Sequence, residues 1–521
     1  MDSYRSWGAG QDITPDQWVH SIDPDYWFTE PISAMRLKRG LDRGDTVEDT
    51  TRVRARIGLI RPGDSMRAIQ AARSAFESWS CRPRAERFAI AMEMNRMLAE
   101  REAEFVDALV GDGHPRELAR WEASGVLLGT GPRMYEAVES LMGSSWTDDG
   151  MRNGYVRQPD GVVGLALPKN AAGSNAAMAL PMLAGGNAVI MKAPRSGALA
   201  AAWLFHEVIL PVLHRTGVED PVCQLVCGAP APILRDWVSS DQVNDVFFIG
   251  GSKRGRKLEQ ECVQTGTKSV LELSGNDALV VWKDADVEAA ALAAAECFLG
   301  SSQICIVPKL AVVHQEVSED FLTHLEAASA RYRPGLVSGE GSLLSPVMDA
   351  PAMVEALEAV AAQGGKLIFG GERLNEREEP DDYGVFFRPA ACVFSDVDVA
   401  LQSSLVVDES FFPILPVVVV NARTDEEVMD RIKELLQRTQ YRLRLSAWGR
   451  SREFAAWVRD LRLGYGLTKM NASHTEFVAG LPTQGGRGLS GDVGAEANYP
   501  LIRTTYIEAF SVPEALMASA V

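Results

Sequence analysis

Several features are scarce in this 521-residue sequence. Seven cysteines are scattered along the chain, too few for a disulfide framework, so we expect a reducing, cytoplasmic setting. The uncharged stretch 170–191 contains Gly, Pro, Ser and Asn and makes a poor membrane span, and the acidic first residues do not form a signal peptide. Acidic residues outnumber basic ones by 70 to 52, which gives a net charge of -18. Nucleic acid and membranes are therefore not expected as partners.

Short apolar runs alternate with longer helical stretches from Gly161 onward. The first runs are GVVGLAL, AVIMK, VCQLV, NDVFFIGG and SVLEL, and the second series is DALVVW, KLAVVH, KLIFG, PILPVVVV and LSAWG. Alternation of this kind predicts parallel α/β sheets. Together with the length, it predicts two α/β units that join near Ser274 and Gly275, preceded by a helical stretch over 64–104. Residues 1–60 are polar and give no clear pattern.

Four polar features stand out against this pattern. In FIGGSKRG, residues 248–255, a strand ends in glycines and opens into a helix whose N–H groups suit a phosphate, although a tight turn without a ligand explains it equally. Glu272 lies in an apolar strand, where it is either paired and used or simply faces outward. Cys305 is either an inert small hydrophobe or a nucleophile. Asn170 follows a strand, where it either forms a turn or points at the ligand crevice of the sheet.

Taken together, these positions resemble the aldehyde dehydrogenase superfamily over residues 68–507. The matching segments are AIQAARSAFESW with AERF, LPKN ending at Asn170, GNAVIMKAPRS with Lys192, FIGGSKRG, LELSG with Glu272, SSQIC with Cys305, DESFFP with Glu409 and Phe411, and QGGRGLSG. Their order and spacing agree with those of the family. The resemblance implies an α/β fold with two Rossmann-type parallel-sheet domains and a small oligomerisation arm.

The resemblance also implies how the chain is divided. Residues 1–146 and 164–273 are expected to form a dinucleotide-binding domain, residues 274–491 a catalytic domain, and residues 147–163 and 492–521 the arm. Members of this family usually pair subunits through such strands, so a homodimer or homotetramer is implied.

The implied reaction is the oxidation of an aldehyde to its carboxylic acid with NADP or NAD. Cys305 is expected to add to the aldehyde carbon and form a thiohemiacetal. The side chain of Asn170 and the backbone N–H of Cys305 would stabilise its oxyanion. Hydride loss leaves a thioester, and Glu272 activates the water that hydrolyses it.

One departure from the family bears on the choice of cofactor. The resemblance places the cofactor at Lys192 (adenosine ribose), Gly250, Gly251 and Ser252 (pyrophosphate turn), Glu409 (nicotinamide ribose) and Phe411 beside it. Arg195 stands where the family often has an acidic residue that bonds the adenosine ribose. An acidic residue repels a 2′-phosphate, whereas Arg pairs with one, so we favour NADP and leave NAD open.

Other departures concern the substrate. Lys169 replaces a family Trp, and small residues fill Ala171–Met178, where large apolar ones are common. Lys169 either meets an anionic substrate or lies at the surface. His474, Thr475 and Phe477 are expected at the wall of the pocket by family position alone. Aliphatic, aromatic and anionic aldehydes all stay open as substrates.

The same residues bear on other possible functions and on a possible metal site. A CoA-acylating aldehyde dehydrogenase would pass the acyl group to CoA, whereas Glu272 favours water. A cysteine hydrolase needs a histidine partner, and none of the seven histidines stands in a recognisable motif. Retention of Asn170, Glu272 and Cys305 argues against a catalytically silent homologue that serves as a binding protein. Cys223 and Cys227 have no accompanying His or Cys pair, so no metal site is expected.

Overall fold

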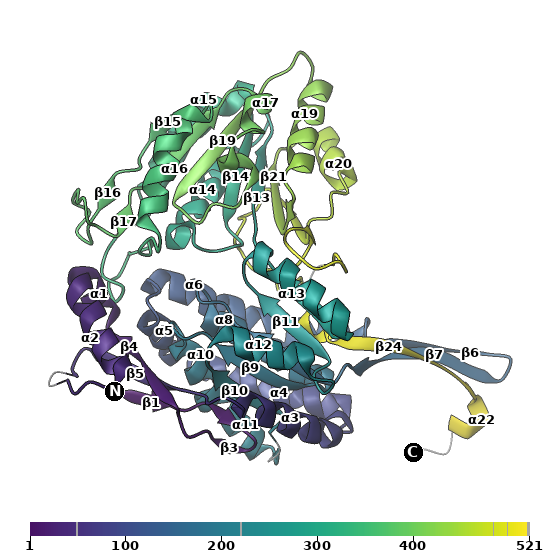
Figure 1. Cartoon of the computed structure of the whole chain (residues 1–521). Helices are drawn as coiled ribbons and strands as arrows, with labels where there is room; N and C mark the ends of the chain where they lie inside the picture. The colour runs from purple at the N-terminus through teal and green to yellow at the C-terminus, as the bar shows by residue number, and fades with distance from the viewer. Residues whose placement is uncertain (48–49, 219–220, 483, 497–498, 518–521) are drawn as a thin grey trace.

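Two α/β domains and a thin arm make up the molecule (Figure 1). The structure is a computed structural model and describes residues 1–47, 50–218, 221–482, 484–496 and 499–517. Each domain is built on a seven-stranded sheet. No helix within these ranges is long and apolar enough to cross a membrane.

The sheet of the first domain is buried on both faces. Its strands, in spatial order, are β12 (Lys268–Glu272), β11 (Asp245–Ile249), β8 (Val162–Ala166), β9 (Ala188–Ala193), β10 (Cys223–Cys227), β2 (Trp7–Gly8) and β3 (Gln11–Asp12). The first five are parallel, and the N-terminal pair adds antiparallel to β10. Alternate residues of β9 enter two different core clusters. This two-sided burial explains why the strands read as continuous apolar runs.

Helices cover both faces of this sheet. They are α3 (Asp64–Ser80), α4 (Arg84–Glu100), α5 (Glu102–Gly111), α6 (Arg116–Gly129), α7 (Pro132–Glu139), α8 (Ala172–Ala176), α9 (Ala179–Gly185), α10 (Leu199–Leu204), the π-helical segment η1 (Phe205–Ile209), α11 (Leu210–Arg215), α12 (Pro230–Ser239) and α13 (Ser252–Thr265). The connections β8 to β9 and β11 to β12 run through helices, as parallel pairing requires.

The second domain repeats the pattern on a mixed sheet. Its strands, in spatial order, are β15 (Lys366–Phe369), β18 (Ala390–Phe394), β19 (Ile414–Val420), β14 (Pro308–His314), β13 (Asp277–Val281), β21 (Arg444–Trp448) and β22 (Leu467–Met470). Only β15, at the edge, is antiparallel to its neighbour. Its helical segments are α14 (Val287–Ala295), η2 (Glu296–Ser302), η3 (Gln315–Val317), α15 (Ser318–Ser329), α16 (Ala350–Ala362), α17 (Val397–Ala400), α18 (Ser404–Val407), α19 (Asp425–Arg438) and α20 (Arg452–Asp460).

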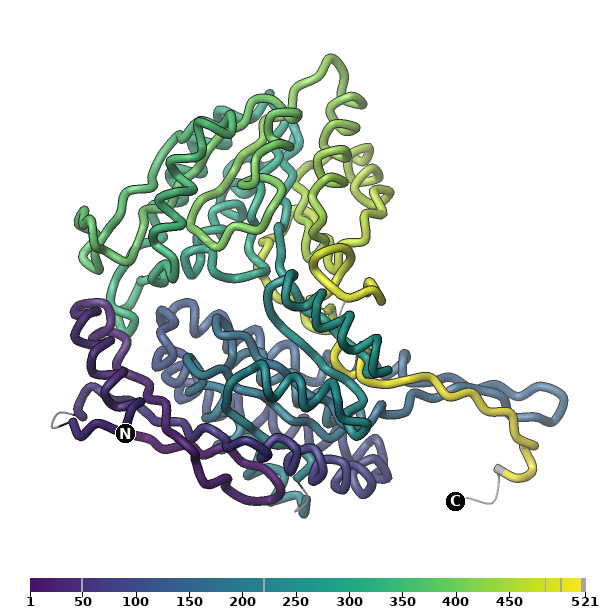
Figure 2. Tube along the Cα trace, in the orientation of Figure 1, coloured from purple at the N-terminus to yellow at the C-terminus, as the bar shows by residue number. Residues whose placement is uncertain are grey.

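The arm is a three-stranded antiparallel sheet. It consists of β24 (Thr505–Pro513), β7 (Met151–Pro159) and β6 (Gly143–Asp148), with α21 (Pro500–Arg503) before β24 and α22 (Glu514–Met517) after it. Figure 2 shows these distant segments running side by side away from the body of the molecule. Two further short ladders are β16 (Arg373–Leu374) with β17 (Phe386–Phe387) and β20 (Tyr441–Arg442) with β23 (Arg487–Gly488).

The N-terminal segment, which the sequence left unassigned, is structured and touches both domains. It forms the sheet β1 (Asp2–Tyr4), β5 (Val53–Leu59) and β4 (Gln17–Ile22), with helices α1 (Pro24–Thr29) and α2 (Pro31–Arg43) between β4 and β5. The Asp25 carboxylate accepts the backbone N–H of Val337 at 2.7 Å. The Phe28 ring lies edge-on to Phe386, with centroids 5.5 Å apart. The segment therefore links the first domain to the second.

Candidate active site

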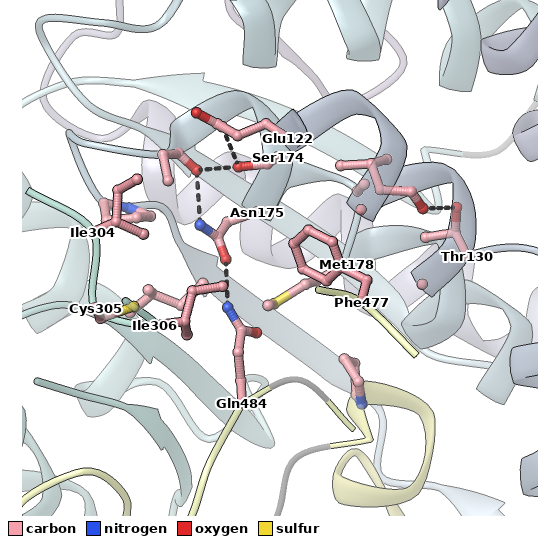
Figure 3. A pocket seen from close by; sticks show the side chains of 18 of the residues that line it. Glu122, Thr130, Ser174, Asn175, Met178, Ile304, Cys305, Ile306, Phe477 and Gln484 are labelled. Carbon is pink, nitrogen blue, oxygen red and sulfur yellow. Dashed lines mark hydrogen bonds between the residues drawn. The ribbon is translucent and has the colours of Figure 1, made fainter. Parts of the chain in front are cut away.

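A cavity of about 160 Å³ lies where the two domains meet. Its wall includes Trp121 of α6, Asn170, Met178 and Cys305, together with Phe477 from the second domain. Figure 3 shows the labelled cysteine, methionine and phenylalanine side chains around this space. The structure thus brings Asn170 and Cys305, 135 positions apart in the sequence, to one cavity.

Cys305 follows a tight left-handed turn. Gly300, Ser301 and Ser302 have φ values of 57°, 57° and 60°, a conformation that costs a non-glycine residue roughly 1–2 kcal/mol. The Ser301 hydroxyl donates to the carbonyl of Ser345, which helps to hold the turn. Cys305 itself is partly exposed, and so is accessible from the cavity.

The junction between the domains lies directly against the cysteine. A Cβ added to Gly275 would come within 2.3 Å of the carbonyl oxygen of Cys305. Only glycine therefore allows this close approach. Ser274 and Gly275, near which the sequence predicts the join, lie between the end of β12 and the start of β13.

The surroundings of the Cys305 thiol disfavour its ionisation. Burial raises the pKa of the thiol, and the carboxylates of Glu272, Glu409 and Asp277 raise it further. The Arg444 guanidinium acts in the opposite direction. The thiol therefore holds its proton at neutral pH until a base takes it.

Asn170 turns toward the cysteine segment. It follows β8 at the carboxyl edge of the parallel strands, and its Nδ2 donates to the carbonyl oxygen of Gln303 at 3.0 Å. An amide nitrogen has two donors, and the bond to Gln303 uses one of them among the residues that the structure describes, so the other is available to a ligand in the cavity. The neighbouring Lys169 lines a different cavity of about 580 Å³, which Arg195 also lines.

Glu272 is the last residue of β12 and is 1% exposed. Its backbone pairs with Gly491 in an isolated antiparallel bridge. Its charge raises the pKa of the Cys305 thiol, so the carboxylate lies within electrostatic reach of the sulfur. The outward-facing alternative considered for this side chain is therefore wrong.

The glycine turn opens into α13 as the sequence predicts. Gly251 precedes the helix, no described side chain caps it, and a Cβ added to Gly251 would meet nothing within 4 Å. Open space at a helix N-terminus suits a phosphate group. The Ser252 hydroxyl donates to the carbonyl of Leu489 at 2.6 Å, so it fastens the turn. Lys192 is buried near the end of β9, and Arg195 beyond it is exposed.

Glu409 and Phe411 lie on the second domain beside the cysteine segment. The Glu409 carboxylate accepts the backbone N–H of Gly275 at 2.9 Å. Burial raises the pKa of Glu409, and the Lys309 ammonium lowers it. The Phe411 ring packs on that ammonium, 4.8 Å from Nζ to the centroid.

Lys309 was missed by the sequence analysis. This lysine is 1% exposed, and its ammonium donates to the Ser302 carbonyl, to the Ser302 hydroxyl at 3.0 Å and to the Ser410 carbonyl at 2.9 Å. It thereby fastens the left-handed turn before Cys305 to the loop that carries Glu409. The sequence did contain a signal for Lys309, because it is a charged residue inside the apolar run PKLAVVH. The same kind of signal indicated Glu272.

Two of the predicted wall residues do not line the main cavity. His474 is completely buried, its Nδ1 lies 2.7 Å from the Ser446 hydroxyl, and its Nε2 lies 3.4 Å from Asp277. Burial, together with the charge of Arg444, lowers the pKa of His474 to about 3, so the ring is neutral. Thr475 donates its N–H to Glu296 at 2.8 Å. Of the predicted trio, Phe477 alone is on the wall among the described residues.

Comparison with known proteins identifies the class. The model of the aldehyde dehydrogenase family matches residues 46–509, so the chain belongs to this family. The benzaldehyde dehydrogenase (NAD+) of Pseudomonas putida is 27% identical over 451 residues, 84% of this chain and 86% of its own length. A vanillin dehydrogenase of Corynebacterium glutamicum is 28% identical over 418 residues, 78% of this chain and 80% of its own.

The fold is also similar to that of solved aldehyde dehydrogenase structures. The crystal structure of an NAD-dependent aldehyde dehydrogenase from Sinorhizobium meliloti superposes with a TM-score of 0.80 at 21% identity, covering 98% of this chain and 95% of that one. The resemblance read from the sequence and the expected fold class are therefore confirmed, and the chain is an aldehyde dehydrogenase.

The buried ammonium leads to a first prediction. In Lys309→Met, two backbone carbonyls and a hydroxyl lose their donor in a buried site, so we expect the free energy of unfolding to fall by about 2–3 kcal/mol. Denaturant titration measures this value, and Lys366→Met, at an exposed lysine of β15, is the matched control. Equal stability of the two variants would contradict the role of Lys309 in fastening the turn.

Proposed function

We propose that the protein oxidises an aldehyde to its carboxylic acid through a covalent thioester on Cys305, with NADP or NAD as hydride acceptor. The observation that carries the proposal is the meeting of Cys305 and Asn170 in one cavity, with the charge of Glu272 acting on the same sulfur. Two relatives take their names from benzaldehyde and vanillin, which are aldehydes of the kind that such a site oxidises.

Each residue has one task in this proposal. The Cys305 thiol first releases its proton to water in the cavity, and the thiolate sulfur then bonds to the aldehyde carbon. The side-chain N–H of the Asn170 amide and the backbone N–H of Cys305 stabilise the resulting oxyanion by roughly 3 kcal/mol per donor. A bound nicotinamide supplies the acceptor for the hydride that leaves this carbon. Glu272 then takes a proton from water, the water oxygen bonds to the thioester carbon, and the carbon–sulfur bond breaks to release the acid.

The residues of this chain that would hold the cofactor favour NADP. Lys192 and Arg195 lie three residues apart at the end of β9, and Arg195 is exposed, so its guanidinium is free to turn toward a ligand. A guanidinium pairs well with a phosphate group, and NADP carries a phosphate on the 2′-oxygen of its adenosine ribose that NAD lacks. Glu409 and Phe411 would hold the opposite end of the dinucleotide.

We also propose that the arm pairs subunits, as the sequence suggests. In this proposal residues 1–146 and 164–273 form the first domain, and residues 274–491 form the second. The arm carries large apolar side chains that are strongly exposed in the single chain, namely Trp146, Tyr506 and Ile507. Apolar surface of this kind is normally covered by a partner. A homodimer or homotetramer would provide that cover.

Replacing the nucleophile is the most direct test. In Cys305→Ala no thiohemiacetal can form, so the formation of reduced nicotinamide should fall at least about a thousandfold. The change in absorbance on cofactor reduction measures it. Cys81→Ala, at an exposed cysteine, serves as the control and should match the natural protein. Substantial reduction by the Cys305→Ala protein would end the thioester mechanism.

Glu272→Gln separates acylation from hydrolysis. Without the base, the first turnover should remain fast while steady-state turnover falls by roughly 100-fold or more. Rapid mixing would then record a burst of one reduced nicotinamide per active site before the slow phase. Steady turnover equal to that of the natural protein would remove Glu272 from hydrolysis.

Arg195→Glu tests the cofactor preference. Loss of the guanidinium and gain of a carboxylate should lower the ratio of kcat/KM for NADP to that for NAD by roughly tenfold to a hundredfold. Arg215→Glu, at an exposed arginine on α11, should leave the ratio unchanged. If Arg195→Glu also leaves it unchanged, Arg195 does not contact the 2′-phosphate.

A further inference from the structure

One face of the cavity is apolar and firmly packed. The rings of Trp121 and Phe477 lie with centroids 4.9 Å apart, and Figure 3 shows Met178 beside Phe477. Phe477 also packs against Gly125, where an added Cβ would come within 2.3 Å of the ring. The Arg444 guanidinium lies 5.9 Å from the centroid of the same ring. This face offers a fixed surface on which a flat apolar group can lie.

Another part of the wall is polar. The Ser174 hydroxyl donates to the Glu122 carboxylate at 2.8 Å, and the Gln484 amide donates to the Asn175 side-chain oxygen at 3.2 Å. Asn175 in turn donates to the carbonyl of Ala171 at 2.8 Å. Figure 3 shows these groups as a connected set that lies between Cys305 on one side and Phe477 on the other. The donors and acceptors hold one another in place before any ligand enters.

Glu122 is the single charged side chain among the described residues of the wall, and it is 5% exposed. Its second oxygen lies 2.5 Å from Nδ1 of His114, which comes from just beyond α5. Burial lowers the pKa of His114, but the carboxylates of Glu122 and Asp112 outweigh this effect, so its pKa lies above the usual value. The His114 ring therefore holds one oxygen of the carboxylate from outside the cavity.

This charge arrangement restricts the substrate. An anionic aldehyde would face Glu122 without a cation on the described wall, because Lys169 lines the neighbouring cavity instead. A hydroxyl donor is better matched, because each oxygen of a carboxylate accepts about two hydrogen bonds and each oxygen of Glu122 has one protein partner among the bonds described here. The volume of about 160 Å³ is close to the roughly 150 Å³ of a cavity that holds one benzene ring.

We propose that Glu122 and Ser174 are specificity-determining residues that select a compact uncharged aldehyde, about one six-membered ring in size, whose hydroxyl donates to the Glu122 carboxylate. The inference rests on the proposed function and narrows its substrate class. The ring lies between Trp121, Phe477 and Met178, the aldehyde carbon faces Cys305, and the hydroxyl faces Glu122. Anionic semialdehydes are excluded by the same carboxylate.

The natural protein with a matched substrate series provides the first test. The series contains benzaldehyde and its hydroxy, methoxy and carboxy derivatives at each ring position, where the methoxy group is a substituent without a donor. We expect the best hydroxy isomer to exceed its methoxy counterpart in kcat/KM by roughly tenfold or more, since its bond is to a charged acceptor. The carboxy isomers should be the poorest. A carboxy isomer as the best substrate, or equal values for hydroxy and methoxy pairs, would overturn the proposal.

Variants then locate the discrimination. Glu122→Gln and Ser174→Ala should each reduce the hydroxy-to-methoxy ratio, Glu122→Gln by roughly tenfold. Met178→Leu, which alters the apolar face at nearly constant volume, should leave that ratio unchanged. If Glu122→Gln lowers kcat/KM equally for both members of a pair, Glu122 has a structural role and the proposal fails.

Different results would refute the specificity of Glu122 and the proposed function of the protein. Oxidation of every aldehyde without discrimination would refute the specificity of Glu122 and leave the proposed function standing. No oxidation of any aldehyde with either nicotinamide would refute both. A folded Cys305→Ala protein, measured in parallel, shows whether any observed turnover belongs to this site.

Discussion

A single buried ammonium group connects the parts of the site that must act together. Lys309 reaches the Ser302 carbonyl and hydroxyl on one side and the Ser410 carbonyl on the other, and its charge lies under the Phe411 ring. The first contact holds a left-handed turn that serine adopts only at a cost. The second fixes the loop beside Glu409. The position of the thiol relative to Glu409 and Phe411 therefore depends on one lysine that is 1% exposed.

The sequence was sufficient for features that have a local pattern. Cys305, Asn170 and the turn at Gly250 and Gly251 each lie at the end of a recognisable run, and their order alone indicated the family. Glu272 was recognisable because a carboxylate is rarely buried in an apolar strand unless it is paired or used. For these residues, the residue type and the neighbouring sequence are enough to suggest the chemistry.

The rest depends on contacts between distant residues and was out of reach. His474 was placed on the cavity wall, yet Ser446 and Asp277 hold it in the interior. His114, in the loop between α5 and α6, pairs with Glu122 of α6, and neither residue belongs to a motif that would have indicated the contact. The N-terminal helices gave no signal, because α1 has only six residues and packs on a domain far along the sequence.

That N-terminal segment has a mechanical consequence. For the second domain to swing away from the first, Phe28 has to leave Phe386, and Val337 has to give up its bond to Asp25. The larger cavity beside Lys169 and Arg195 is walled on one side by the same segment. Its residues thus hold the two domains together at this point, and one wall of that cavity is made by a stretch of chain that supplies none of the proposed reacting groups.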